Sequence, residues 1–356
     1  MLHFFNIIIR ISITSFIFIG LFAPFSLYAQ KEIDKRIEML IQTGIDKVNK
    51  EKTDEALKAF RNIIDSEKES PIGYFYTAAL YQVLMQNYRT MVFNDKFDYY
   101  INEAIEKGEK LVKNDKDNDL AYFYLGGSYG YRAINKTEKG NWFGAFVDAV
   151  KGADYLEKAL DINPKLYDAY YGLGVYKYWR SVKSRVLWFL PFFGDERQKG
   201  IDEMQRAIAQ GSYSRIEAKG ALVTILLNEG LYDSALHFTN EILSEYPENI
   251  NAIRDKGIIL VELKRWDEAT LIFNKLAERL KESRWKGPEA KMEIEYYLTL
   301  IYQKLGKMNE YKRGCENLIQ LTKKLERKNL SETINELIIK VNILCKIPKP
   351  EKEQEA

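Results

Sequence analysis

Hydrophobic residues recur with a helical rhythm along most of this chain. Beyond residue 31, apolar side chains return every three or four positions. No stretch shows the sustained alternation of apolar and polar residues that a half-buried strand needs. The pattern therefore predicts an all-α protein. Residues 1–29 have a different pattern and are interpreted separately below.

The helical pattern repeats along the chain with two different periods. Ala235 and Ala269 are 34 residues apart, whereas the central tyrosines Tyr74, Tyr122 and Tyr170 are spaced by 48. Two sets of small residues share the longer spacing: Ala78, Gly126 and Gly174, and Ala104, Gly152 and Gly200. Divided between two helices, the 14 additional residues would lengthen each helix by seven, or about 10 Å. We therefore expect three central helical hairpins with long arms.

The best-preserved copy of the repeat lies within residues 159–176. Ala-Leu-Asp-Ile-Asn-Pro at residues 159–164 is followed by Asp-Ala-Tyr-Tyr-Gly-Leu-Gly-Val-Tyr at residues 168–176. This segment resembles the tetratricopeptide repeat (TPR) family, although tyrosine stands where tryptophan is commonest. The resemblance implies a right-handed superhelical α-solenoid of helical hairpins. In such hairpins small residues allow close helix packing, and a proline ends the second helix.

The two periods predict a complete domain map. We expect a TPR-like solenoid over residues 30–346, closed by a capping helix at 331–346 that begins at Ser331. Its repeats are predicted as one short repeat at 36–70, long repeats at 71–118, 119–166 and 167–213, and short repeats at 214–247, 248–286 and 288–327. Residues 347–356 are rich in charge and proline and are expected to be disordered.

The amino terminus has the composition of an export signal. Within residues 1–29, Arg10 is the one charged side chain, an apolar segment follows it, and Ala29 is a small residue at the expected cleavage position. We expect a signal peptide and a location in the periplasm or on the periplasmic side of the outer membrane. The alternative is an uncleaved N-terminal membrane anchor.

Composition disfavours several classes of function. The 53 Lys and Arg residues nearly balance the 51 Asp and Glu residues, which argues against nucleic-acid binding. His237 is the one histidine beyond residue 29, and no phosphate-binding loop or multi-cysteine metal motif occurs. We predict a protein without catalytic residues, metal or cofactor. Cys315 and Cys345 lie at similar distances from a predicted turn, so they form either a disulfide or two buried thiols.

Two groups of residues are candidates for partner binding. The family resemblance implies a concave groove lined by first helices, with these candidates: Phe75, Phe123, Tyr171, Tyr178, Arg132 and Arg180. The alternative for this group is packing between repeats. The tips of the long arms also carry aromatic residues, including Trp142, Phe143, Trp188 and Phe189, which either pack on neighbouring arms or form an exposed contact ridge.

The function predicted from these features is a non-catalytic scaffold of the bacterial cell envelope. Its partner would be a protein or peptide held in the concave groove, and any membrane contact would be peripheral at most. One alternative is a membrane assembly factor that touches the bilayer or a membrane protein through the aromatic tips. Another is a carrier of a small apolar ligand.

Overall fold

The computed structural model describes residues 34–184, 194–285, 287–325 and 330–346. These residues form fifteen α-helices and no strand, as the sequence pattern predicts. The helices are α1 (Lys35–Asn49), α2 (Thr53–Ser66), α3 (Ile72–Tyr88), α4 (Asn94–Asn114), α5 (Asp119–Glu138), α6 (Trp142–Ile162), α7 (Ala169–Ser184), α8 (Arg197–Gln210), α9 (Arg215–Asn228), α10 (Tyr232–Glu245), α11 (Ile250–Glu262), α12 (Trp266–Glu282), α13 (Pro288–Lys304), α14 (Met308–Lys324) and α15 (Glu332–Leu344). None of the helices described has the length and hydropathy needed to cross a bilayer. The predicted signal peptide and tail lie outside the described residues.

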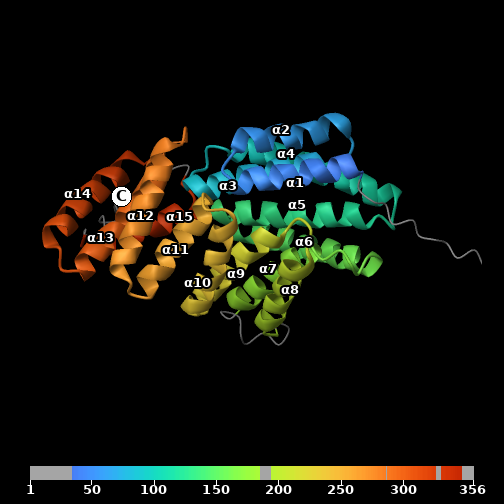
Figure 1. Cartoon of the computed structure of the whole chain (residues 1–356). Coiled ribbons are helices and arrows are strands. Elements are labelled where there is room, and N and C mark those ends of the chain that lie inside the picture. The colour runs from blue at the N-terminus through green and yellow to red at the C-terminus, as the bar shows by residue number, and fades with distance from the viewer. Residues whose placement is uncertain (1–33, 185–193, 286, 326–329, 347–356) are drawn as a thin grey trace, which may run out of the picture. The chain divides into compact units, whose positions relative to one another are not determined.

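Local sequence fixes many of the helix ends. Asn118, Asn141, Asn249 and Ser331 precede helices, and each side chain accepts a hydrogen bond from a backbone N–H in the first turn. Gly140, Gly230 and Gly306 follow helices with φ near +70°, a conformation that glycine adopts without steric cost. Each helix packs mainly on its sequence neighbours, so the chain forms a succession of hairpins (Figure 1).

The small residues with the 48-residue period mark the points where paired helices cross. A Cβ atom added at Gly126 of α5 would lie 2.8 Å from the Gly152 carbonyl oxygen of α6, and one at Gly152 would lie 2.9 Å from the Gly126 oxygen. Gly174 of α7 and Gly200 of α8 meet in the same way. A Cβ atom at Gly174 would lie 2.6 Å from the Gly200 carbonyl oxygen, and one at Gly200 would lie 2.7 Å from the Gly174 oxygen. The absence of side chains at these positions therefore allows backbone-to-backbone contact.

Helix α5 offers a matched pair of substitutions that tests this close approach. We expect Gly126→Ala to destabilise the protein by about 1–3 kcal/mol, because the methyl group would force α5 and α6 apart. Gly130 lies one turn further along, and nothing is within 4 Å of its Cβ position. Gly130→Ala should therefore stabilise α5 by about 0.5–1 kcal/mol. Urea denaturation followed by circular dichroism measures both, and equal effects would contradict the crossing.

The longest helices lie in the first part of the chain. Helices α4, α5 and α6 have 21, 20 and 21 residues, whereas α1 and α2 have 15 and 14, and α9 to α11 have 13 or 14. The third repeat expected to be long contains α7 and α8, with 16 and 14 residues. Residues 185–193 between them lie outside the described residues. The exact division into repeats remains a prediction.

Helix α3 departs from the pattern of a simple stack of hairpins. All but three of its 17 residues are buried. It packs against α2, α4 and α5, and also against α11 and α13, which follow it by more than 160 residues. Its sequence, IGYFYTAALYQVLMQNY, is apolar around the whole circumference, as expected of a helix surrounded by others.

Several polar contacts join the N-terminal helices to the C-terminal repeats. Asn249 Nδ2 donates to Asn49 Oδ1 at 3.0 Å, and the Ile250 N–H donates to Glu51 Oε1 at 3.1 Å. At the surface, Arg284 Nη2 lies 2.5 Å from Asp54 Oδ1. The first hairpin therefore contacts directly repeats that follow it by about 200 residues in the chain. We call this set of contacts the end-to-end closure.

Candidate interaction surfaces

The predicted concave groove is not open in the structure. Phe75, Phe123 and Tyr178 are only 7%, 9% and 0% exposed. The ring of Phe75 packs edge-on against Tyr124 at 5.3 Å between centroids, and a Cβ atom at Gly127 would lie 2.9 Å from that ring. These three candidates are therefore packing residues between repeats. The prediction that they line a binding surface is wrong for this arrangement.

Tyr178 and Tyr171 occupy different environments. The Tyr178 hydroxyl donates to Glu229 Oε1 at 2.6 Å and accepts from Asn228 Nδ2 at 2.7 Å, so its polar end is satisfied within the protein. Tyr171 is partly exposed. Burial, followed by the negative charge of Glu217, raises the pKa of its hydroxyl far above the usual value. Tyr171 alone does not make a groove.

The two candidate arginines stabilise their own hairpins. Arg132 Nε and Nη2 donate to the two carboxylate oxygens of Asp148 at 2.7 and 2.9 Å. Arg180 makes the corresponding contact with Glu196. In both hairpins the acidic partner follows the arginine by 16 residues. The 48-residue spacing of these arginines thus reflects a repeated structural ion pair, and both guanidinium groups are engaged within their own hairpins.

A buried charged cluster joins α3, α11 and α13. Glu293 accepts hydrogen bonds from Arg89 Nε at 3.1 Å and from Arg254 Nε at 2.8 Å. Arg254 is almost fully buried, and its second nitrogen donates to the Asn87 carbonyl oxygen at the end of α3. Burial by itself would raise the pKa of Glu293, but the charges of Arg89 and Arg254 outweigh burial and lower it. The cluster is therefore a charged part of the end-to-end closure.

Carboxyl groups between the N-terminal and C-terminal repeats are shielded from water. Burial raises the pKa of Glu51 to about 7, despite the hydrogen bond from the Ile250 N–H. Burial likewise raises the pKa of Glu217 to about 7 and that of Asp255 to about 6. Glu217 belongs to α9 and Asp255 to α11, and Glu51 lies in the turn between α1 and α2. At neutral pH the folded protein therefore holds protons that the unfolded chain releases.

These raised pKa values predict that the protein is more stable at pH 5.5 than at pH 8. The pKa of Glu217 rises from 4.5 to about 7 on folding, so its destabilising effect is full above pH 7 and disappears below pH 4.5. The effect amounts to roughly 1–3 kcal/mol per carboxyl at pH 8. Glu217→Gln should raise the melting temperature at pH 8 and flatten its pH dependence. Equal pH dependence in the wild type and the variant would contradict this assignment.

The two cysteines are joined in the structure. The sulfur atoms of Cys315 and Cys345 are 2.16 Å apart, and their Cα atoms are 5.5 Å apart. Cys315 belongs to α14, and Cys345 follows directly after α15. The Tyr311 hydroxyl also donates to the Leu344 carbonyl oxygen at 2.8 Å, close to the same junction. The last helix is therefore fixed to the repeat before it.

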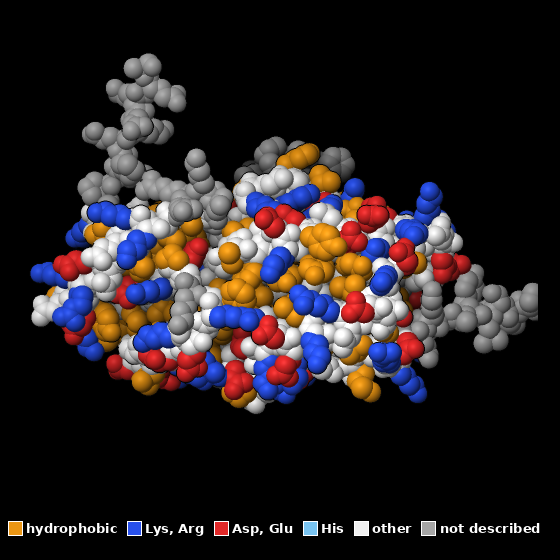
Figure 2. Space-filling model, turned by 90° about the horizontal axis from the view of Figure 1, so that it is seen from above, with side chains coloured by type: hydrophobic (Ala, Val, Ile, Leu, Met, Phe, Trp, Pro, Cys, Tyr) orange, Lys and Arg blue, Asp and Glu red, His pale blue; other side chains and the backbone are white. Residues whose placement is uncertain are grey.

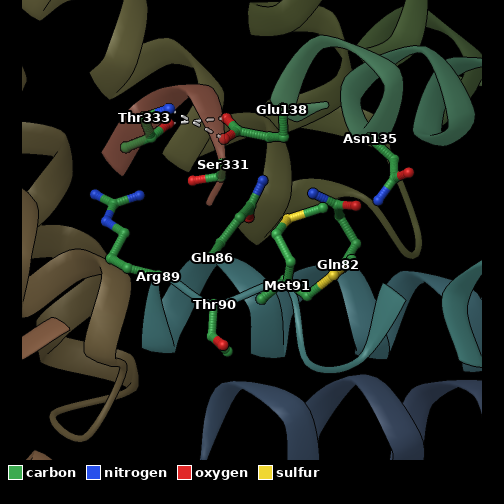
Figure 3. A pocket seen from close by; sticks show the side chains of 10 residues that line it. Gln82, Gln86, Arg89, Thr90, Met91, Asn135, Glu138, Ser331 and Thr333 are labelled. Carbon is green, nitrogen blue, oxygen red and sulfur yellow. Dashed lines mark hydrogen bonds between the residues drawn. The ribbon is translucent and has the colours of Figure 1, made fainter. Parts of the chain in front are cut away.

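A small polar pocket lies where α15 meets the ends of α3 and α5. Figure 3 shows Gln82 and Gln86 of α3, and Arg89 directly after it, around a pocket that Asn135 and Glu138 of α5 also line. The Thr333 hydroxyl of α15 donates to Glu138 Oε1 at 2.9 Å across one side of the pocket (Figure 3). The hydrogen bond between Thr333 and Glu138 joins α15 to α5, and we assign the pocket no ligand.

The predicted aromatic ridge is only partly within the described residues. Trp142 and Phe143 lie at the start of α6 and are exposed. Trp188 and Phe189 lie outside the described residues. The first half of α6 thus exposes aromatic rings to solvent, whereas the α7–α8 side of the predicted ridge stays a prediction.

Sequence reasoning missed an open, tyrosine-lined pocket between α2, α3 and α4. Tyr74, Tyr99 and Tyr100 form one side, and Arg61 and Asp65 of α2, with Ile64 between them, form the other. We call this the tyrosine–arginine pocket. Figure 2 views the molecule from the side where α2 and α4 lie, and shows apolar and aromatic side chains gathered there between charged ones. The adjacent pair Tyr99-Tyr100, of which only one residue can face the buried side of an amphipathic helix, was the available signal.

The aromatic rings of this pocket support one another. The ring of Tyr100 lies 5.0 Å from Tyr99, 5.8 Å from Tyr81 and 6.4 Å from Tyr74, measured between centroids. The Lys107 ammonium lies 4.8 Å from the centre of the Tyr74 ring. Tyr99 is 58% exposed, whereas Tyr74 and Tyr81 are buried. The pocket therefore presents a rigid aromatic wall with positive charge beside it.

Comparison with known proteins shows similarity in fold alone. No family model and no curated protein matches the chain. The structure is similar to the APC/C hetero-tetramer Cut9–Hcn1, with a TM-score of 0.52 and 12% identity over 88% of this chain and 49% of that one. It is also similar to a tetratricopeptide repeat protein of Parabacteroides merdae, with a TM-score of 0.41 and 15% identity over 86% of this chain and 99% of that one. The type IV pilus biogenesis factor PilW is similar too, with a TM-score of 0.47 and 15% identity over 70% of this chain and 95% of that one.

The fold and the repeated helix crossings together define the class of protein. The chain is a TPR-like helical repeat protein, an α-solenoid whose paired helices meet at small residues. Proteins of this class typically serve as scaffolds for other proteins, but the fold does not specify the partner. In the part of the chain that the structure describes, no group of three or more His, Cys, Asp or Glu residues could hold a metal ion.

Proposed function

We propose that this protein is a non-catalytic scaffold of the bacterial cell envelope that binds a protein or peptide through the tyrosine–arginine pocket. The observation that carries the proposal is the exposed aromatic wall beside Arg61, on helices that are fixed by packing. Tyrosine and arginine are enriched at binding hot spots, because rigid rings bury large areas at little entropic cost. The filled concave side leaves this outer pocket as the better candidate for recognition.

The charges around the pocket suggest the chemistry of the partner. Arg61, Lys96 and Lys107 surround the tyrosine rings, with Lys96 5.6 Å from the centre of the Tyr81 ring, and the Lys107 ammonium is paired with Glu103 at 3.1 Å. Asp65 is the acidic residue of the pocket lining. A segment that carries an apolar or aromatic side chain next to a carboxylate would bury its ring on Tyr99 and pair with Arg61. We therefore propose an acidic, partly apolar peptide segment as the partner.

The proposed location rests on two independent features. Residues 1–29 have the composition of a signal peptide. The Cys315–Cys345 disulfide is of a kind that persists in oxidising compartments such as the periplasm and is rare in the cytosol. Both features support export. A fusion of residues 1–40 to alkaline phosphatase should be active in a bacterial host, and an inactive fusion would contradict the proposed location.

Affinity capture from envelope extract tests the proposed partner site. The wild-type protein should capture a specific protein that the double variant Arg61→Ala and Tyr99→Ala loses. Leu271→Ala changes an exposed apolar residue elsewhere and should retain the partner. Direct binding of the captured protein would then be measured by calorimetry, with a loss of at least 10-fold in affinity expected for the double variant. A partner that binds both variants equally, or no specific partner at all, would overturn the proposal.

A further inference from the structure

The first half of α6 carries the most concentrated exposed apolar surface among the described residues. Phe143 is 80% exposed, Phe146 50%, Trp142 48% and Val147 37%. They lie at relative positions 1, 2, 5 and 6, so they share one side of the helix. We call these four residues the α6 aromatic face. Leu231 and Leu271 are exposed singly, which is ordinary for a protein surface, and Ile339 with Ile343 on α15 form a smaller exposed pair without aromatic rings.

Lysine side chains flank the α6 aromatic face, and the Glu332 carboxylate of α15 lies near the turn at Gly140 that precedes it. Asp148 is the only acidic residue from 142 to 151, and it is buried and paired with Arg132 and Lys136. The exposed Lys183 holds its ammonium group 5.1 Å from the centre of the Trp142 ring. Lys151, also exposed, follows the face along α6. Aromatic rings flanked by lysines match the boundary between acyl chains and anionic headgroups.

The shape of the α6 aromatic face favours a deformable partner. Neither of the two pockets described above includes any of its residues. The face begins directly after the turn at Gly140 and Asn141, at the end of the α5–α6 hairpin. Large aromatic side chains at the end of a hairpin can enter a fluid bilayer, which adapts to their shape without a preformed hollow. Lysine side chains beside them can extend toward lipid phosphates while the rings enter the interface.

We propose that the α6 aromatic face docks on the surface of an anionic phospholipid bilayer. The contact is peripheral: Phe143 and Phe146 enter the interface, Trp142 lies at headgroup level, and Lys151 and Lys183 contact the phosphates. This lipid site is separate from the tyrosine–arginine pocket in α2, α3 and α4. The protein would therefore hold its partner on one surface while resting on the membrane with another.

Vesicle flotation of the disulfide-bonded protein lacking residues 1–29 tests this proposal. The probes are vesicles of phosphatidylcholine alone and vesicles of phosphatidylcholine in which about 30% of the lipid is anionic phosphatidylglycerol. The wild type should float with the anionic vesicles, and less so as salt rises. Phe143→Ser with Phe146→Ser should lower the partition coefficient roughly 10- to 100-fold. Lys151→Glu with Lys183→Glu should lower it about 10-fold or more at low salt.

A matched control isolates the contribution of this particular face. Leu231→Ser with Leu271→Ser also removes two exposed apolar side chains and should leave flotation unchanged. Circular dichroism and melting temperature verify that every variant is folded. A wild type that does not float, or a Phe143 and Phe146 variant that floats equally well, would overturn the proposal. A dimer in gel filtration that these phenylalanine substitutions dissociate would also overturn it, since the face would then bind a second copy. So would a protein that the wild type captures and the same variant loses, without any lipid binding.

Discussion

Replacing Glu293 by alanine is expected to destabilise the protein by about 3–5 kcal/mol. Glu293 is the shared acceptor for Arg89 and Arg254, and its removal would leave two guanidinium groups without their carboxylate. Arg254 is 1% exposed and has no access to water that could replace the lost contact. Because α3, α11 and α13 meet at this cluster, the substitution should loosen the end-to-end closure before it affects the α5–α6 hairpin.

Urea denaturation measures the effect of Glu293→Ala, and hydrogen exchange locates it. Amides of α3 should exchange faster, whereas those of α5 and α6 should change less. Glu268→Ala is a suitable control, because Glu268 pairs with Arg265 at the surface, where such a bridge contributes about 0–1 kcal/mol. If Glu293→Ala and Glu268→Ala had equally small effects, the buried cluster would not support the closure.

Removal of the disulfide should be the second large effect. The bond closes a loop with a sequence separation of 30 residues, which corresponds to about 3–4 kcal/mol from chain entropy. We expect Cys315→Ser with Cys345→Ser to lose this stability. The loss should be concentrated in α15, which is otherwise held by Thr333 on Glu138 and by apolar contacts to α13 and α14.

Thermal melting of the oxidised protein, the reduced protein and the double serine variant measures this contribution. The reduced protein and the variant should have the same melting temperature, which should be lower than that of the oxidised protein. Limited proteolysis should then cut near residues 330–346 first, since α15 loses its covalent link. Three coincident melting curves would show that packing alone holds α15 in place.

The sequence pattern predicts the fold class and the crossing points of the helices. Helical periodicity indicates an all-α chain, and the 48-residue spacing singles out Gly126, Gly152, Gly174 and Gly200, which the structure shows facing one another in two pairs. Both inferences depend on local contacts between neighbouring helices, for which the sequence carries a repeated signal. The ion pairs of Arg132 with Asp148 and of Arg180 with Glu196 follow the same repeat, although the arginines were interpreted as groove residues.

The end-to-end closure could not be predicted from the repeat. It depends on residues far apart in the chain, such as Glu51 with Ile250 and Arg89 with Glu293, and these contacts have no counterpart in other repeats. A signal was nevertheless present in residues 72–88, which are apolar on all sides rather than on one face. Such a helix must be covered on every side, so an open groove beside Phe75 was improbable on physical grounds.

The α6 aromatic face could be predicted in part from the sequence, whereas the tyrosine–arginine pocket could not, because the pocket depends on contacts among three helices. The aromatic residues at Trp142 and Phe143 follow a turn, and their exposure is consistent with a position at the end of a hairpin. The tyrosine–arginine pocket combines residues from α2, α3 and α4, so it exists only once three helices are packed. Tyr74 was interpreted as a repeat marker, and its role as one wall of a pocket depends on Tyr99 and Tyr100.

The distance between residues 54 and 284 tests the end-to-end closure most directly. Asp54→Cys and Arg284→Cys would carry spin labels for a pulsed electron resonance measurement, with the native cysteines protected in their disulfide. The side chains at these two positions are in contact in the structure, so a narrow distribution at the short end of the measurable range is predicted. An open solenoid would separate α2 and α12 by five repeats, or about 50 Å at 8–10 Å per packed layer. A distribution centred near that longer distance would contradict the closed arrangement.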